Sequence, residues 1–231
     1  MLRFCANRAI REAASSVEKV SVLASGGLDS SVLIAKLAAD AEVHPIYVRC
    51  GLAWEDAELA VLRLFIGALK KRNVARVTEL SAPAAALYGD HWSVTGKGVP
   101  AADEPDENTY LPGRNILLIS LAAIWGSTHG ISRIAIGSLG GNPFPDATTE
   151  FFESFGRDLS IGLAHKVLIE APLRGFHKED LIRDFNDLPL QLTLTCMAPV
   201  GSMHCGQCNK CFERQQAFRK ASVVDRTVYL S

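Results

Sequence analysis

Four cysteines near the end of the sequence have the spacing that most directly suggests chemistry. The six cysteines stand at positions 5, 50, 196, 205, 208 and 211, so the last four fall within sixteen residues. Their pattern is Cys-x8-Cys-x2-Cys-x2-Cys, and Gly206 permits a tight turn inside it. Four thiolates suit the closed tetrahedral geometry of structural zinc. We therefore predict a zinc ion held by Cys196, Cys205, Cys208 and Cys211.

The same spacing leaves alternatives open, because it does not separate zinc from an iron–sulfur cluster or from a redox pair of thiols. His204 adjoins Cys205, but four cysteines already complete a ligand set. Such a set has no open coordination position, so we expect the zinc to be structural. Cys50 stands apart: it is a candidate for a thioester with substrate, although a small buried thiol is the interpretation we favour.

Residues 25–31 (SGGLDSS) form a second group with chemical potential. The two glycines let the backbone turn sharply and approach a phosphate, and a helix that opens near Asp29 would add free N–H groups. Three serine hydroxyls are further donors, so the segment predicts a phosphate-binding nest. It matches neither a Walker loop nor a Gly-x-Gly-x-x-Gly dinucleotide loop. A plain strand-to-helix turn with Asp29 as the N-cap is the alternative.

Alternating strand and helix patterns surround these residues. Strands are predicted at 17–24, 43–50, 74–80, 131–137 and 166–170, and helices at 29–39, 55–71, 112–127, 148–159, 177–184 and 208–220. This alternation predicts an α/β fold with a five-stranded parallel sheet and helices on both faces. Ligands of such sheets bind at the carboxyl ends of the strands. The long segment 81–108 has little periodicity and is a candidate lid.

The amino-acid composition narrows the classes of protein to which this chain could belong. Lys plus Arg number 24 and Asp plus Glu 25, which gives a net charge of −1 and does not favour nucleic acid as a partner. Hydrophobic residues make up 48%, so the chain can bury a sizeable core. No apolar run is long enough to span a membrane, and charges interrupt the N-terminal residues where a signal peptide would need an apolar core. We expect a cytoplasmic protein without membrane partners.

The loop Ser-Gly-Gly-x-Asp-Ser after the first strand resembles the pyrophosphate loop of the N-type ATP pyrophosphatases, which adenylate a substrate and release pyrophosphate. This resemblance implies that Asp29 lies near the phosphates and a Mg²⁺ ion, and that the end of the second strand frames the adenine. The residues it implies for ATP binding are Ser25, Gly26, Gly27, Leu28, Asp29, Ser30, Ser31, Tyr47 and Val48.

The loop and the cysteine pattern together resemble the 7-cyano-7-deazaguanine synthase family over most of the chain. Further matching segments are 110–115 (YLPGRN), 145–146 (PD), 150–151 (EF), 169–173 (IEAPL) with Lys178, and 194–196 (LTC). The resemblance implies a homodimeric ligase that adenylates 7-carboxy-7-deazaguanine with ATP and uses ammonia to form the nitrile for queuosine biosynthesis. It implies a pyrophosphatase domain over 1–190 and a zinc-binding segment with a helix over 191–231.

Three residues are predicted to act in catalysis, namely Asp29, Arg114 and Lys178. The guanidinium fork of Arg114 suits a phosphate or carboxylate, and with Asp146 and Glu150 it is predicted to bind the substrate. Asp146 would accept from the N–H donors of a guanine-like edge. Each has a plainer alternative: a surface or helix-capping arginine for Arg114, a solvated lysine for Lys178, and an N-cap before Thr148 for Asp146.

Two segments depart from the family pattern where substrate is expected, residues 49–55 (RCGLAWE) and 142–147 (NPFPDA). Trp54 and Phe144 in these segments are candidates to stack on a planar base, or else core aromatics. The departures keep open a related ligase that stops at the amide or couples another carboxylate. A tRNA-modifying pyrophosphatase and a non-catalytic, zinc-stabilised nucleotide-binding module are further alternatives, which the charge balance and the intact glycine loop, respectively, make less favourable.

Overall fold

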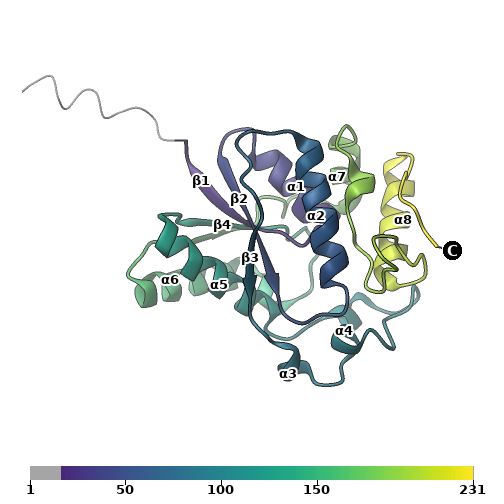
Figure 1. Cartoon of the computed structure of the whole chain (residues 1–231), viewed down its shortest axis with the longest axis horizontal. Coiled ribbons are helices and arrows are strands. Elements are labelled where there is room, and N and C mark those ends of the chain that lie inside the picture. Colours follow the sequence, from purple (N-terminus) through teal and green to yellow (C-terminus); the bar gives the residue numbers. More distant parts are fainter. Residues whose placement is uncertain (1–16, 231) are drawn as a thin grey trace, which may run out of the picture.

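Five parallel strands form the sheet at the centre of the computed structural model, which describes residues 17–230 (Figure 1). The first sixteen residues, with Cys5, and residue 231 lie outside the described part. The strands are β1 (Lys19–Leu23), β2 (Glu42–Arg49), β3 (Thr78–Ser81), β4 (Arg133–Ile136) and β5 (Leu168–Glu170). Their order is β3-β2-β1-β4-β5 with every neighbouring pair parallel, which confirms the predicted fold class.

The central strand β1 contributes to both faces of the sheet. Val20 and Val22 are fully buried in one apolar cluster, whereas Leu23 belongs to the other. Alternate side chains of a strand point to opposite faces of the sheet. A strand that is covered on both faces must therefore carry apolar residues at successive positions, not only at every second one. Strand β2 divides in the same way, with Val43 and Tyr47 in the first cluster and Ile46 in the second.

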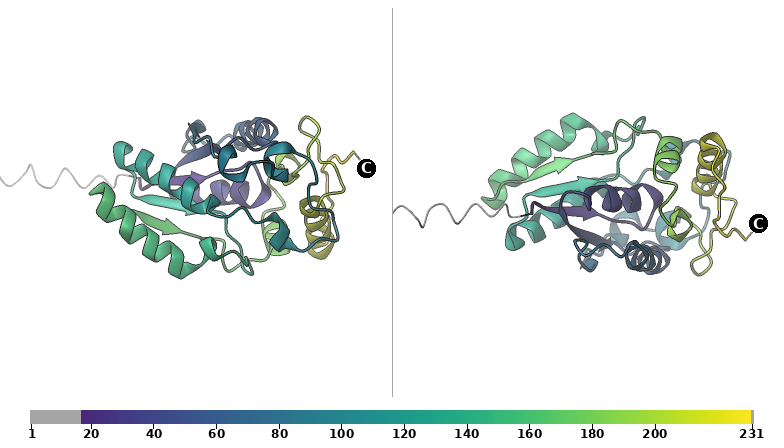
Figure 2. Two further views of the ribbon diagram at one scale, coloured as in Figure 1. Left: turned by 90° about the horizontal axis from the view of Figure 1, so that it is seen from below. Right: turned by 90° about the horizontal axis from the view of Figure 1, so that it is seen from above.

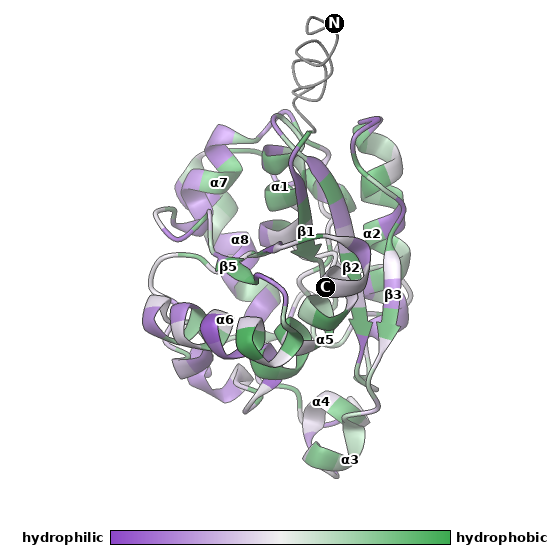
Figure 3. Cartoon of the chain, turned by 90° about the vertical axis from the view of Figure 1, so that its left-hand side faces the viewer, coloured by the Kyte–Doolittle hydropathy of each residue, from purple (hydrophilic) through white to green (hydrophobic). Residues whose placement is uncertain are grey.

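Helices cover both faces of the sheet, as Figure 2 shows from two opposite sides. The principal helices are α1 (Leu28–Leu37), α2 (Glu55–Leu69), α5 (Arg114–His129), α6 (Thr149–Leu163), α7 (Lys178–Asp184) and α8 (Asn209–Ala221). Helix α1 packs on β1 and β2 and also contacts α2 and α7, whereas α5 contacts β1, β2 and β4 on the other face. Helix α5 is apolar around most of its surface (Figure 3), and it contacts both the sheet and α6, which packs on β5.

Some element boundaries differ from the predicted ones for local reasons. Helix α5 begins two residues later than expected, because its N-cap Gly113 has a φ of +75° that a helix does not allow. Strand β3 begins at Thr78, and Val74 forms only an isolated bridge with Val43. Helix α1 begins at Leu28 with Gly27 as its N-cap, so the alternative in which Asp29 caps the helix is wrong.

The segment 81–108, interpreted from sequence as a long loop, contains the one-turn helices α3 (Ala85–Tyr88) and α4 (Trp92–Thr95) and the start of the 3-10 helix η1 (Asp106–Thr109). It contacts the cysteine-containing segment directly. The backbone N–H of Asn209 donates to the Pro100 carbonyl over 2.9 Å, and the Asn209 side chain donates to the Glu104 carbonyl over 2.8 Å. The role of this segment as a lid stays a prediction.

The C-terminal segment shares the two apolar clusters of the sheet. Ala217, Phe218 and Ala221 of α8 belong to the cluster around α1, while Leu194 and the buried cysteines belong to the cluster around α5. The proposed boundary near residue 190 stays a prediction. Within residues 17–230, no helix has the length and apolar character needed to cross a membrane.

Candidate active site

A cavity of about 970 Å³ opens at the carboxyl ends of the strands. Its walls include the residues after β1, the end of β2, the residues after β4, and one face of α8. The chain leaves β1 toward β2 on one side, whereas β4 lies on the other side, so a crevice forms between the loops after β1 and β4. This volume accommodates a nucleotide together with a second small molecule.

The phosphate loop, residues 25–31, follows β1 and continues into α1. The Ser30 hydroxyl donates to the Gly27 carbonyl over 3.2 Å and accepts from the Ser25 backbone N–H over 3.2 Å. The Ser25 hydroxyl accepts from the Gly27 backbone N–H over 3.3 Å. These bonds close the loop around the start of α1, where free backbone N–H groups attract an anion.

Two glycines allow the close packing that the phosphate loop needs. Gly26 has a φ of +73°, and a Cβ at this position would lie 2.5 Å from the carbonyl oxygen of Glu58. Gly137 follows β4, and a Cβ there would lie 3.1 Å from the backbone nitrogen of Ser30. Larger residues would push α2 or the loop after β4 away from the phosphate loop.

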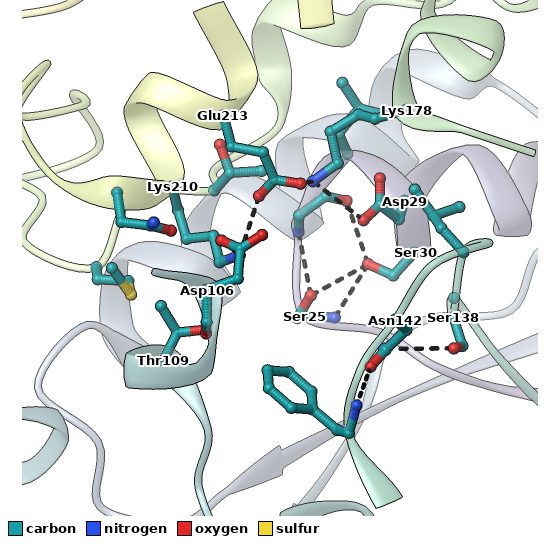
Figure 4. A pocket seen from close by; sticks show the side chains of 18 of the residues that line it. Ser25, Asp29, Ser30, Asp106, Thr109, Ser138, Asn142, Lys178, Lys210 and Glu213 are labelled. Carbon is teal, nitrogen blue, oxygen red and sulfur yellow. Dashed lines mark hydrogen bonds and ion pairs between the residues drawn. The ribbon is translucent and has the colours of Figure 1, made fainter. Parts of the chain in front are cut away.

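Lys178 stands beside the phosphate loop between two carboxylates, as Figure 4 shows. Its Nζ lies 2.6 Å from Oε1 of Glu213 and 3.5 Å from Oδ2 of Asp29. Burial lowers the pKa of Lys178, but the two carboxylates outweigh that effect, so the pKa lies above its ordinary value. Burial raises the pKa of Asp29 despite the nearby lysine. The lysine is therefore a fixed positive charge at the loop.

A second polar cluster lies at the end of β2. The Tyr47 hydroxyl donates to Oε2 of Glu58 over 2.9 Å and also lies 3.1 Å from the Glu55 carbonyl oxygen. Burial raises the pKa of Glu58 from 4.5 to about 7, although Arg114 and the Tyr47 hydrogen bond act in the opposite direction. Arg114 also lines the cavity, and its Nε is buried without a hydrogen-bond partner. Glu58 is therefore the group of this cluster whose pKa lies near neutral pH.

Asp146 fixes the start of α5 from the 3-10 helix η2 (Pro145–Ala147). Its Oδ2 accepts from the Asn115 backbone N–H over 3.1 Å, and its Oδ1 accepts from the Asn115 side chain over 3.3 Å. Thr148 caps α6 instead, with its side chain accepting from the Phe151 N–H over 3.1 Å. The alternative in which Asp146 caps the helix after it is therefore wrong.

The four C-terminal cysteines converge on one point. The sulfur atoms of Cys196, Cys205, Cys208 and Cys211 all lie within 4.8 Å of one another. Two of the separations are 3.9 Å (Cys205 to Cys211) and 4.0 Å (Cys208 to Cys196). Sulfur atoms around a tetrahedral zinc ion stand about 3.8 Å apart, given zinc–sulfur bonds of about 2.3 Å. The cluster therefore fits a metal ion such as zinc.

Backbone N–H groups support the sulfur atoms of this cluster. Sγ of Cys196 accepts from the N–H groups of Ala198 (3.3 Å) and Cys205 (3.2 Å), and Sγ of Cys205 accepts from that of Cys208 (3.4 Å). Such donors stabilise thiolates and orient them toward a metal. None of these four residues forms a disulfide.

Comparison with known protein families identifies the family to which this chain belongs. The model of the family described as "Queuosine biosynthesis protein QueC" matches residues 19–222, which include the phosphate loop, Lys178 and all four cysteines. The chain belongs to the QueC family. The family uses ATP, which agrees with a phosphate loop that lines the cavity.

Individual relatives agree with the family over nearly the whole chain. A protein of Desulfitobacterium hafniense named 7-cyano-7-deazaguanine synthase 1 is 32% identical and covers 87% of this chain and 91% of its own length. The 7-cyano-7-deazaguanine synthase of Anaeromyxobacter dehalogenans is 32% identical, with 94% and 98% covered. That of Methanothermobacter thermautotrophicus is 28% identical, with 91% and 98% covered.

A solved structure shares the fold of this QueC family member. The U34-tRNA thiolase NcsA from Methanococcus maripaludis, determined with its [4Fe-4S] cluster, superimposes with a TM-score of 0.51 and 13% identity. The superposition covers 91% of this chain and 70% of the thiolase. At this identity, the likeness concerns the fold alone.

The structure brings most of the residues predicted from sequence to one cavity in this QueC family member. Those that line it are Ser25, Gly27, Leu28, Asp29, Ser30, Tyr47, Val48, Arg114, Asp146, Lys178 and Cys196. Gly26 and Ser31 belong to the loop without lining the cavity, and Cys205, Cys208 and Cys211 are not among the lining residues either. Glu150 is exposed on α6 and does not line the cavity, and Cys50 is buried outside its lining. The individual roles of these residues stay predictions.

The two aromatic residues singled out from sequence line the cavity in stacked pairs. Trp54 stacks on Trp92 with ring centroids 5.6 Å apart, and Phe144 stacks on Tyr110 at 4.9 Å. Trp54 is only 5% exposed. Both pairs contribute aromatic side chains to the cavity lining, which suits a planar ring.

Sequence reasoning missed Glu58, Glu213 and Lys210. All three line the cavity, and Lys210 also pairs with Asp106 over 3.1 Å. The helical period of the last helix could have indicated two of them, Lys210 and Glu213. If Cys211 faces the metal, residues 210 and 213 lie on neighbouring parts of another helix face. Glu58 gave no such signal, because charged residues in α2 are ordinarily solvent-exposed.

Proposed function

We propose that this chain is a 7-cyano-7-deazaguanine synthase. It adenylates 7-carboxy-7-deazaguanine with ATP and uses ammonia to form the nitrile for queuosine biosynthesis. The observation that supports this proposal is the phosphate loop with Lys178 at one end of a cavity large enough for both ATP and a purine-sized acid. The names of the relatives support the same substrate class.

The first step activates a carboxylate, whose oxygen is a poor leaving group. A carboxylate oxygen attacks the α-phosphorus of ATP, the bond to the β-phosphate oxygen breaks, and pyrophosphate leaves. The N–H groups at the start of α1 bind the phosphates, and the Lys178 ammonium neutralises the charge that develops on pyrophosphate. Arg114, which also lines the cavity, binds the carboxylate of the substrate.

Ammonia then attacks the carbonyl carbon of the adenylate, and AMP leaves with the bonding electrons to give the amide and a proton. A second adenylation, now on the amide oxygen, releases a second pyrophosphate. Loss of AMP and of both nitrogen-bound protons then gives the nitrile. Glu58, whose pKa is raised to about 7 by burial, is the carboxylate of the cavity best suited to accept a proton near neutral pH.

The proposal includes two metal sites, one for zinc and one for Mg²⁺. The four cysteines hold a structural zinc, as their mutual distances and N–H donors favour. Asp29, whose Oδ1 is buried without a hydrogen-bond partner, is the residue of the phosphate loop that would hold Mg²⁺ with the ATP phosphates. When bound, Mg²⁺ supplies charge neutralisation for the departing pyrophosphate. The proposal further takes the protein as cytoplasmic, homodimeric and without nucleic-acid or membrane partners.

The test is one incubation with 7-carboxy-7-deazaguanine, ATP, Mg²⁺ and ammonium, in which all products are read by mass spectrometry. We expect the nitrile, with two AMP and two pyrophosphate released for each nitrile. Lys178→Met is expected to slow AMP release by about 100- to 1,000-fold, whereas Glu153→Gln, an exposed residue of α6 outside the cavity, leaves it unchanged. No AMP release with intact, metal-loaded protein would reject the proposed substrate.

A second candidate is a QueC-like ligase that stops at the amide or acts on a different carboxylate. The two segments that depart from the family pattern both line the cavity, through Trp54 and Glu55 on one side and Asn142 and Phe144 on the other. They therefore contact whatever occupies it. Amide with one AMP per turn, and no nitrile on longer incubation, would favour this candidate.

A further inference from the structure

The first part of α8 presents two distinct faces. Lys210, Glu213 and Gln216 line the cavity, at intervals of three residues. Cys211 and Arg214 are fully buried on another face. Because Cys211 is one of the four clustered thiols, the position of the cluster determines the rotation of α8 about its axis. The same rotation directs Glu213 into the cavity.

Glu213 contacts Lys178 more closely than any residue of the phosphate loop does. Its Oε1 lies 2.6 Å from the lysine Nζ, whereas the Asp29 oxygen lies at 3.5 Å. Its other oxygen, Oε2, lies 3.0 Å from Nζ of Lys210, which in turn pairs with Asp106 at 3.1 Å. Figure 4 shows these residues as one row of alternating charges across the cavity. Both oxygens of Glu213 are thus held in place.

Lys178 needs such an anchor because of its own position. It is the first residue of α7, and its ammonium reaches the phosphate loop on a flexible stem of four methylene groups. A stem of this kind populates several rotamers unless a partner selects one. The ion pair at 2.6 Å to Glu213 is a short charge-assisted hydrogen bond of the type that does so.

We propose that Glu213 is the positioning residue for Lys178, and that it holds the lysine ammonium at the phosphate loop from a helix whose rotation is set by the four-cysteine cluster. This inference rests on the proposed function in one respect, which is the role of Lys178 in neutralising pyrophosphate. It gives the metal-binding segment a part in the adenylation site beyond stabilising the fold.

The kinetic test is a double-mutant cycle that follows AMP release. In Glu213→Gln we expect kcat to fall about tenfold, while KM for ATP changes less than threefold, because the substitution keeps the side-chain shape and removes only the charge that orders the lysine. Adding Glu213→Gln to Lys178→Met should cause no further loss. Glu213→Asp should recover part of the activity. Equal losses from Glu213→Gln with and without Lys178 would overturn the proposal.

A second measurement does not depend on catalysis. The ¹H–¹⁵N signals of the lysine ammonium groups are recorded for the metal-loaded protein, with Lys178 assigned by Lys178→Arg. We expect an ordered Lys178 signal that Glu213→Gln broadens or removes and that Glu153→Gln leaves unchanged. An unaltered Lys178 signal in Glu213→Gln would overturn the proposal, even with a fully active wild type. Absence of AMP release from the wild type would instead reject the proposed function.

Discussion

The backbone N–H of Leu194 donates to the carbonyl oxygen of Gly26 over 2.8 Å. This single bond joins the residue two positions before Cys196 to the turn of the phosphate loop. A Cβ on the adjacent Gly27 would lie 3.6 Å from the Leu194 carbonyl oxygen, which shows how closely the two segments approach. The metal cluster and the nucleotide site are therefore neighbours in space, although about 170 residues separate them in the chain.

Removal of the metal should weaken both stability and ATP binding. Without an ion, four clustered thiolates repel one another or take up protons, and the segment from Leu194 to Cys211 loses its anchor. We expect a loss of at least about 3 kcal/mol in the free energy of unfolding, or about 6–12 °C in Tm. We also expect ATP affinity to fall by about tenfold. Calorimetry before and after chelation measures both, and restoring the metal should restore both. Unchanged ATP affinity in metal-free protein would separate the two sites.

Gly26→Ala should destabilise the protein by about 1–3 kcal/mol, since the residue has a positive φ and its Cβ would collide with the Glu58 carbonyl oxygen. Denaturant unfolding of this variant and of the wild type measures the difference in the free energy of unfolding. The matched control is Gly67→Ala in α2, where a Cβ meets nothing within 4 Å. Because alanine is the better helix former, that variant should be more stable by about 0.5–1 kcal/mol. A neutral Gly26→Ala would mean that the loop tolerates displacement from α2.

Glu58 makes stability depend on pH in a defined direction. Burial raises its pKa from 4.5 to about 7 in the folded protein. The folded state thus favours the protonated form, and this contribution is complete below pH 4.5 and disappears as the pH rises through 7. We expect Glu58→Gln, which stays neutral, to gain about 1–3 kcal/mol relative to wild type between pH 5 and pH 8. Urea unfolding at both pH values measures this gain, and a difference independent of pH would contradict the raised pKa.

Substitution of Asp146 separates its structural contact from recognition of the substrate. Asp146→Asn keeps an acceptor for the Asn115 backbone N–H, so we expect Tm to change by less than about 3 °C. If the carboxylate also accepts from the guanine-like edge, KM for the deazaguanine acid should rise about 10- to 100-fold with KM for ATP unchanged. Asp146→Ala, which removes the acceptor altogether, should lower Tm further. An unchanged KM for the acid would remove Asp146 from the substrate site.

Much of the fold could be predicted from local patterns in the sequence. The alternation of short apolar runs with helical periods predicted the parallel sheet, because strand and helix periods are properties of adjacent residues. The four cysteines could be recognised for the same reason, since ligands within sixteen residues converge through local turns. The phosphate loop was likewise readable, because its donors are successive backbone groups at the start of one helix.

Only the tertiary structure determines which charged residues, far apart in the sequence, come into contact. Lys178 and Glu213 are 35 residues apart, and Asp106 and Lys210 are 104 apart, so no local period relates them. The burial of Glu58 depends on how α2 packs against Tyr47 and the phosphate loop, and its raised pKa follows from that packing. The cost of desolvating a charge and the gain from pairing it are set by neighbours in space. The electrostatics of this cavity are accordingly a property of the folded chain.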